Sequence, residues 1–189
     1  MSNRAKFFVV SAPSATGKST VIEAVIKEMP ALKKPVSYTT RPPRQGEQNG
    51  IDYNFVDVET FEKMKKQDMF LESAVVYGNL YATAIATVQT ALAGGTFLIK
   101  DIDTQGALEL KNKLGKEAVL IFVNPPSIKD LETRIRQRAC DSEAQIQTRL
   151  DNAKKEMSES SKYDHVIIND NLNEAVSGLK KIISGYMIA

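Results

Sequence analysis

The stretch Ala-Thr-Gly-Lys-Ser-Thr at residues 15–20 closely follows the apolar run Phe-Phe-Val-Val at residues 7–10. This order is typical of a buried strand, a phosphate-binding loop and the start of a helix. In such a P-loop, backbone N–H groups and the helix N-terminus bind phosphate oxygens. Lys18 would reach the β- and γ-phosphates, and the Ser19 hydroxyl would hold Mg²⁺. The stretch predicts a triphosphate site, although Ala12 stands where the full pattern has its first glycine.

Composition limits the classes of function. The chain has 189 residues, 25 Lys plus Arg against 23 Asp plus Glu, and one cysteine. We expect a single domain, no nucleic-acid partner and no general attraction to acidic membranes. No apolar run approaches the roughly 18 residues of a spanning helix, and no signal segment precedes the first strand. We therefore expect a cytoplasmic protein, and composition does not distinguish a monomer from a homo-oligomer.

Apolar runs alternate with helical patterns along most of the chain. The runs at 6–11, 97–101 and 118–123 are continuously apolar or nearly so, as is typical of strands buried on both faces of a parallel sheet. We expect helices at 19–28, 83–93, 127–138, from 142 onward and at 171–183, with a last strand at 166–168. This alternation predicts an α/β fold with a doubly wound parallel sheet.

The segment 35–81 has a different texture, with β-branched and aromatic residues among prolines and glycines. It predicts an inserted β-rich segment with short strands near 36–40, 54–56 and 71–77. Arg41 and Arg44 in this segment could form forked clamps on a phosphate. A solvated turn with ordinary surface charges is the alternative. The upstream P-loop favours the clamp, because a phosphoryl-transfer enzyme needs a second anion site for its acceptor.

Asp101 ends the apolar run at 97–101, at the edge of the sheet where ligands of open α/β folds bind. We expect it to contribute to the Mg²⁺ site. Asp103 can project to the same side, where it could serve a bound base. The alternative for Asp103 is an N-cap of the following helix.

Several of these blocks resemble the guanylate kinase family, and the match extends from about residue 7 to about residue 183. It rests on segments 12–20, 37–53, 77–83, 101–106, 125–127 and 134–149, on Glu72, and on the pairs at 163–164 and 169–170. The resemblance implies a P-loop nucleoside monophosphate kinase that transfers the γ-phosphoryl group of Mg-ATP to GMP, giving ADP and GDP. It also implies a core (1–35, 91–133 and 151–189), a GMP-binding subdomain (36–90) and a helical lid (134–150).

The resemblance implies a role for each matching residue. The catalytic group would be Lys18, Arg41, Arg134, Arg138 and Arg149. ATP would contact Pro13, Ser14, Ala15, Thr16, Gly17, Lys18, Ser19, Thr20 and Asn169. The GMP phosphate would contact Arg41, Arg44, Tyr53 and Tyr81, and the guanine would contact Ser37, Glu72, Thr83 and Asp103. Ser19 and Asp101 would hold Mg²⁺.

The chemistry of guanine agrees with this assignment. Guanine presents N1–H and amino donors beside a carbonyl acceptor, so the carboxylates of Glu72 and Asp103 can accept while the hydroxyls of Ser37 and Thr83 donate. Adenine would leave buried carboxylates unpaired, which allows the site to discriminate against adenine nucleotides by ~10⁴ or more. Taken singly, these residues could equally be surface groups, turn residues or helix caps. The arginines at 134–149 could equally form a salt-bridged helix, and Asn169 an ordinary turn.

The chain departs from the family pattern at several positions. Ala15, Ala82 and Ala139 stand where the family usually has glycine, and Lys100 replaces an expected apolar residue. A positive φ at Ala15 would cost ~1–2 kcal/mol and weaken ATP binding.

Two alternative functions stay open. One is a guanylate-kinase-like binding module without turnover, and the other is a kinase for a different nucleoside monophosphate.

Overall fold

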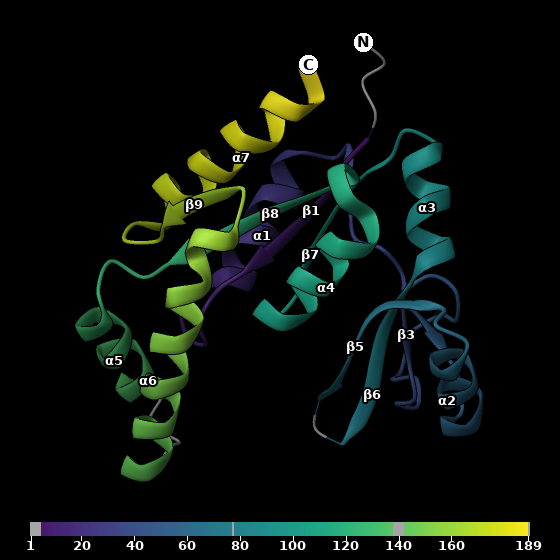
Figure 1. Ribbon diagram of the computed structural model, residues 1–189, viewed down its shortest axis with the longest axis horizontal. Helices are drawn as coiled ribbons and strands as arrows, with labels where there is room; N and C mark the ends of the chain where they lie inside the picture. The colour runs from purple at the N-terminus through teal and green to yellow at the C-terminus, as the bar shows by residue number, and fades with distance from the viewer. Residues whose placement is uncertain (1–4, 77, 138–141, 189) are drawn as a thin grey trace.

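The computed structural model describes residues 5–76, 78–137 and 142–188, and a five-stranded parallel sheet lies at its centre (Figure 1). The strand order is β2-β7-β1-β8-β9. The strands are β1 (Phe7–Ser11), β2 (Leu32–Lys33), β7 (Phe97–Asp101), β8 (Ala118–Asn124) and β9 (His165–Ile168). Every pairing in this sheet is parallel. The predicted fold class is confirmed.

Helices cover both faces of this sheet because its central strand is apolar on both sides. Phe7 and Val9 of β1 pack toward α3 (Ile85–Ala93) and α4 (Thr104–Leu114). Phe8 and Val10 pack toward α1 (Lys18–Glu28) and α7 (Leu172–Ile188). Successive side chains of a strand point to opposite faces, so a continuous apolar run supplies two cores at once.

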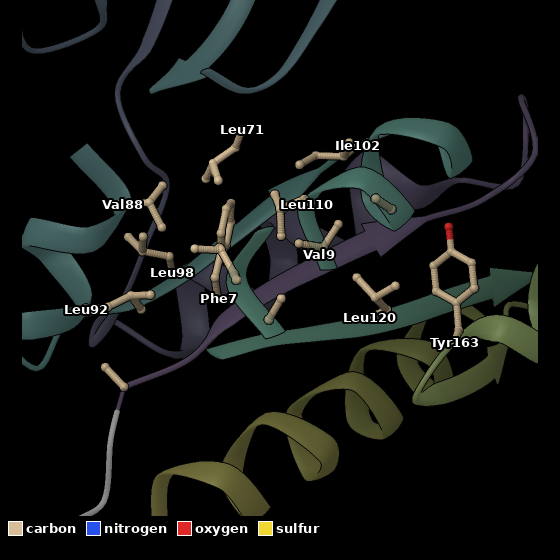
Figure 2. Packing of buried hydrophobic residues seen from close by; sticks show 14 of the residues in the cluster. Phe7, Val9, Leu71, Val88, Leu92, Leu98, Ile102, Leu110, Leu120 and Tyr163 are labelled. Atoms are coloured by element: carbon tan, nitrogen blue, oxygen red, sulfur yellow. The ribbon is translucent and has the colours of Figure 1, made fainter. Parts of the chain in front are cut away.

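A second, four-stranded sheet lies beside the core, in the order β4-β3-β6-β5. It comprises β3 (Ser37–Thr39), β4 (Tyr53–Phe55), β5 (Phe70–Val76) and β6 (Asn79–Ala84), with α2 (Val58–Lys66) packed on it. Figure 2 shows Leu71 of β5 among the core side chains. Burying Leu71 there joins the second sheet to the core.

One expectation about this region was wrong in detail, and some elements of the fold were not predicted. The helix predicted at 83–93 begins only at Ile85, because Thr83 and Ala84 pair with β5 in the sheet. The helix α2 was not predicted, since the surrounding glycines, prolines and aromatic residues suggested only strands. Its start is fixed by Asp57, whose carboxylate accepts a hydrogen bond from the Thr60 N–H at 2.6 Å. The short edge strand β2 was not predicted either.

The helices α5 (Ile128–Gln137) and α6 (Glu143–Ser158) form a separate hairpin. Ser142 caps α6 in the predicted partnership with Gln145. Leu131 and Ile135 of α5 pack against residues of α6, and Ala15 of the P-loop contacts the same cluster. Figure 1 shows the hairpin and the second sheet on opposite sides of α4. Among the described residues, no helix is long and apolar enough to cross a membrane.

Candidate active site

The P-loop connects β1 to α1 and lines a pocket. Residues 12–20 line it together with Asp101 at the end of β7. Gly17 precedes the first residue of α1 and has a φ of 89°, and no side chain caps the helix. The first N–H groups of α1 therefore have no side-chain partner at the cap, which suits binding of an anion.

Lys18 is the cation of this pocket, and its ammonium lies among carboxylates. Burial lowers the pKa of Lys18, while the charges of Asp101, Asp103 and Glu156 oppose that shift. Burial also raises the pKa of Glu156, against the attraction of Lys18. A lysine with a lowered pKa gains from an added negative charge, so this environment favours a phosphate ligand.

The shape of the P-loop depends on contacts from distant parts of the chain. The Asn169 amide donates to the carbonyl of Thr16 at 2.7 Å, and a Cβ at Gly17 would lie 2.8 Å from that amide nitrogen. The Arg134 guanidinium donates to the Thr16 carbonyl at 3.4 Å and to the Asn169 carbonyl at 2.9 Å. Glycine at 17 is thus required both by its positive φ and by this close approach.

Helix α6 also reaches the P-loop. The Arg149 guanidinium donates to the hydroxyl of Ser14 at 3.1 Å. Arg134 and Arg149 therefore both contact the P-loop region, one from each helix of the hairpin. Arg138, Ala139 and Cys140 lie outside the described residues.

A second pocket lies between the core and the second sheet. Ser37, Tyr53, Glu72 and Tyr81 line it from the second sheet, and Lys100, Asp101, Ile102 and Asp103 line it from the core. Lys18 lines it as well. Four residues predicted to contact the guanine base or the phosphate of GMP thus converge from four strands of the second sheet. A fifth, Asp103, joins them from the core.

The predicted base contacts also have partners within the protein. The Thr83 hydroxyl is fully buried and donates to Glu72 Oε1 at 2.6 Å, so it fixes the carboxylate. Asp103 Oδ1 accepts from the Gly106 N–H at 2.8 Å and caps α4, as the alternative for this residue predicted. Asp103 nevertheless lines the second pocket, so capping and a place in the site coexist.

Arg41 and Arg44, two of the residues predicted to bind the GMP phosphate, both contact Glu47. Its carboxylate accepts two hydrogen bonds from the Arg41 guanidinium, at 2.8 and 3.0 Å, and one from the Arg44 N–H at 2.7 Å. These bonds lower the pKa of Glu47, that from Arg41 most strongly. Arg41 also lies 5.4 Å from the ring centre of Tyr53, whose ring is 6.0 Å from that of Tyr81. Arg41, Tyr53 and Tyr81 are thus brought together.

Comparisons with known proteins identify this arrangement. The family model described as guanylate kinase matches residues 4–186. A guanylate kinase of Desulfotalea psychrophila is 44% identical over 181 residues, which cover 96% of this chain and 89% of that protein. The chain belongs to the guanylate kinase family. A guanylate kinase of Shewanella denitrificans, also 44% identical, matches 97% of this chain and 88% of its own length.

A solved guanylate kinase has the same architecture. The crystal structure of guanylate kinase from Anaplasma phagocytophilum superposes with a TM-score of 0.72 and 30% identity, over 100% of this chain and 89% of that one. The resemblance inferred from sequence is confirmed. The comparisons favour a phosphotransferase over the binding-module alternative.

Three residues in this guanylate kinase fold had no assigned role from sequence. Lys100 donates to Glu72, Ser37 and Thr83 inside the second pocket. Glu47 holds Arg41, and Gly106 lets α4 approach β5, since a Cβ there would lie 3.4 Å from that of Glu72. The sequence signalled a role for Lys100 alone, because this residue departs from the family pattern. The roles of Glu47 and Gly106 gave no signal, because the partners of all three residues come from a loop or from segments far away in sequence.

Proposed function

We propose that this guanylate kinase family member transfers the γ-phosphoryl group of Mg-ATP to GMP, giving ADP and GDP. The observation that carries the proposal is that Lys18 and Asp101 line both the P-loop pocket and the second pocket. A donor triphosphate in one pocket and an acceptor phosphate in the other would meet beside these two residues. Such adjacency is what phosphoryl transfer needs, because its catalysis is mostly positioning and charge stabilisation.

On the donor side, residues 13–20 and Asn169 bind ATP, and Lys18 neutralises the β- and γ-phosphates. Arg134 and Arg149 add charge near the transferred group, because both already contact the P-loop. Ser19 and Asp101 line the same pocket and offer the oxygen ligands that suit Mg²⁺. When bound, this ion neutralises charge on the phosphate oxygens.

On the acceptor side, Arg41, Arg44, Tyr53 and Tyr81 bind the phosphate of GMP. Glu47 would hold the Arg41 guanidinium in place, and Arg41 would offer its remaining N–H groups to the phosphate. Ser37, Glu72 and Asp103 contact the base, and Thr83 holds Glu72 in place.

We further propose that residues 36–90 act as a GMP-binding subdomain and residues 134–150 as a lid. Closure of both over the core would bring the acceptor to the γ-phosphate and exclude water, which would otherwise receive the phosphoryl group. Arg138 would join Arg134 and Arg149 in this role.

An assay of ADP formation with Mg-ATP and a panel of acceptors (GMP, dGMP, AMP, UMP and dTMP) tests the proposal. We expect turnover with GMP that is lost in Lys18→Ala and kept in Lys27→Ala, an exposed lysine of the same helix. Folded protein that binds GMP but turns over no acceptor would support the binding module instead. Faster turnover of another monophosphate would support the third alternative.

A further inference from the structure

Lys100 brings a positive charge into the pocket proposed for the base. It lies on β7 opposite Val9, on the strand face it shares with Leu98. That face carries the apolar cluster with α3, α4 and Leu71 of β5, so an apolar side chain is expected here. The lysine side chain is instead 19% exposed, and its ammonium enters the second pocket.

The ammonium binds three side chains from three strands of the second sheet. Its Nζ lies 2.8 Å from Glu72 Oε1, 2.5 Å from Thr83 Oγ1 and 3.0 Å from Ser37 Oγ. An ammonium has three N–H donors, and these three acceptors use all of them. Lys100 is thus held among the same side chains that the proposed function assigns to base recognition.

The bonds to Glu72 change what this carboxylate requires from a base. Both Lys100 and Thr83 donate to Oε1, so that oxygen has partners before any nucleotide binds. Guanine offers two kinds of donor on this edge, N1–H and the 2-amino group, while hypoxanthine offers N1–H alone. With Oε1 satisfied by the protein, a single N–H donor to Oε2 leaves neither oxygen of Glu72 unpaired, and the carboxylate of Asp103 is exposed to water.

The bond to Ser37 fixes which group of the base is selected. The Ser37 hydroxyl accepts from Lys100, so its own proton remains available for an acceptor in the pocket. A 6-oxo group is such an acceptor, whereas the 6-amino group of adenine would present a donor to a donor. The Ser37–Lys100 pair therefore favours 6-oxopurines.

We propose that Lys100 is a specificity-determining residue that selects the 6-oxo group of the acceptor and relaxes the requirement for the 2-amino group. The enzyme would then phosphorylate IMP, the hypoxanthine nucleotide, as well as GMP. This inference rests on the proposed function, because it concerns the acceptor of the same reaction.

A purely structural role for Lys100 is the competing explanation, and the chain offers a matched control. Lys113 of α4 also joins the core to the second sheet, through Asp68 Oδ1 at 2.9 Å and the carbonyl of Phe70 at 2.8 Å. It does not line the second pocket. Lys113→Met removes a similar link without touching the proposed base site.

The decisive experiment measures kcat/KM for GMP, IMP and AMP in wild type, Lys100→Met and Lys113→Met. In wild type we expect a preference for GMP over IMP of less than about a hundredfold. Discrimination stays in this range when the substrate lacks a group, here the 2-amino group, and its loss leaves no buried group of the site unpaired. In Lys100→Met this preference should rise at least about fivefold, because Glu72 Oε1 then keeps only the neutral Thr83 donor and loses its charged one. The preference for GMP over AMP should fall, because the Ser37 hydroxyl becomes free to accept from an amino group. Lys113→Met should leave both ratios unchanged.

A wild-type preference for GMP over IMP above about a hundredfold would overturn the inference, and this test needs no variant. Equal losses for all three acceptors in Lys100→Met would also overturn it, since they would indicate a structural link only. Wild type that phosphorylates none of the three would instead overturn the proposed function, so the two failures are distinguishable.

Discussion

The P-loop pocket and the second pocket are assembled in opposite ways. The P-loop pocket is lined almost entirely by consecutive residues, 12–20. The groups that we propose to bind phosphate there are largely backbone N–H groups and one lysine. The second pocket takes side chains from β3, β4, β5, β6 and β7. A site made of consecutive residues can be recognised from its motif, whereas a site made of side chains from separate strands depends on the tertiary structure. A single departure such as Lys100 can therefore change the second site without disturbing the first.

The strongest test of the P-loop side is Arg134→Ala, since this guanidinium holds the carbonyls of Thr16 and Asn169. We expect kcat to fall about tenfold to a hundredfold, the equivalent of roughly 1.5–3 kcal/mol for a charged hydrogen-bonding group. Steady-state kinetics with ATP and GMP measures this. Arg136→Ala is the control, because Arg136 lies on the same helix but pairs with Glu132 and Glu143 at the surface. If both variants lost activity equally, Arg134 would have no special role at the P-loop.

The corresponding test of the acceptor side is Glu47→Gln. The amide cannot accept both Arg41 bonds as a carboxylate does, so Arg41 should lose its fixed orientation. We expect KM for GMP to rise about threefold to tenfold, with kcat and KM for ATP nearly unchanged. Asp52→Asn is the control, since Asp52 accepts a hydrogen bond from Gln48 in the same loop. An unchanged KM for GMP would mean that Glu47 does not prepare Arg41 for the phosphate.

The P-loop pocket and the second pocket differ in how much of each can be predicted from the sequence. The P-loop, the doubly wound sheet and the Ser142 cap were predictable, because each depends on residues close together in sequence or on a regular apolar pattern. The strand β6 and helix α2 were not, because turn residues and aromatic residues obscure their periodicity. The network around Lys100 was beyond prediction, since its partners at 37, 72 and 83 are brought together only by the second sheet.

The charge of Lys18 gives a smaller, pH-dependent test of the P-loop side. Burial lowers the pKa of this lysine. The added negative charge of ATP should raise the pKa of Lys18. Binding should therefore take up a proton when the pH lies between the pKa of Lys18 without ATP and its pKa with ATP bound. At about pH 9 the phosphates are fully ionised and do not contribute. Calorimetry of ATP binding in buffers of different ionisation enthalpy should show partial proton uptake in wild type and in Lys27→Met. Zero uptake across the alkaline range would contradict the lowered pKa.

The smallest expected effect is that of Ala15→Gly, where two opposing contributions nearly cancel. Ala15 has a φ of 68°, which costs a residue with a Cβ ~1–2 kcal/mol. Its methyl group also contacts the cluster of α5 and α6, and burial of one methyl group contributes ~0.8 kcal/mol. Glycine should therefore leave the thermal unfolding temperature nearly unchanged while the loop relaxes around the β-phosphate. We expect KM for ATP to fall about twofold to fivefold.

Ala12→Gly is the matched control for this variant. Ala12 also lies in the P-loop and contacts the apolar cluster under α1 and α7, but its φ is not positive. Removing its methyl group should lower stability without improving KM for ATP. If Ala15→Gly left both turnover and KM for ATP unchanged, strain at Ala15 would not influence ATP binding. The replacement of glycine would then be tolerated because the α5–α6 hairpin packs on the methyl group, which links the P-loop to the helices that carry Arg134 and Arg149.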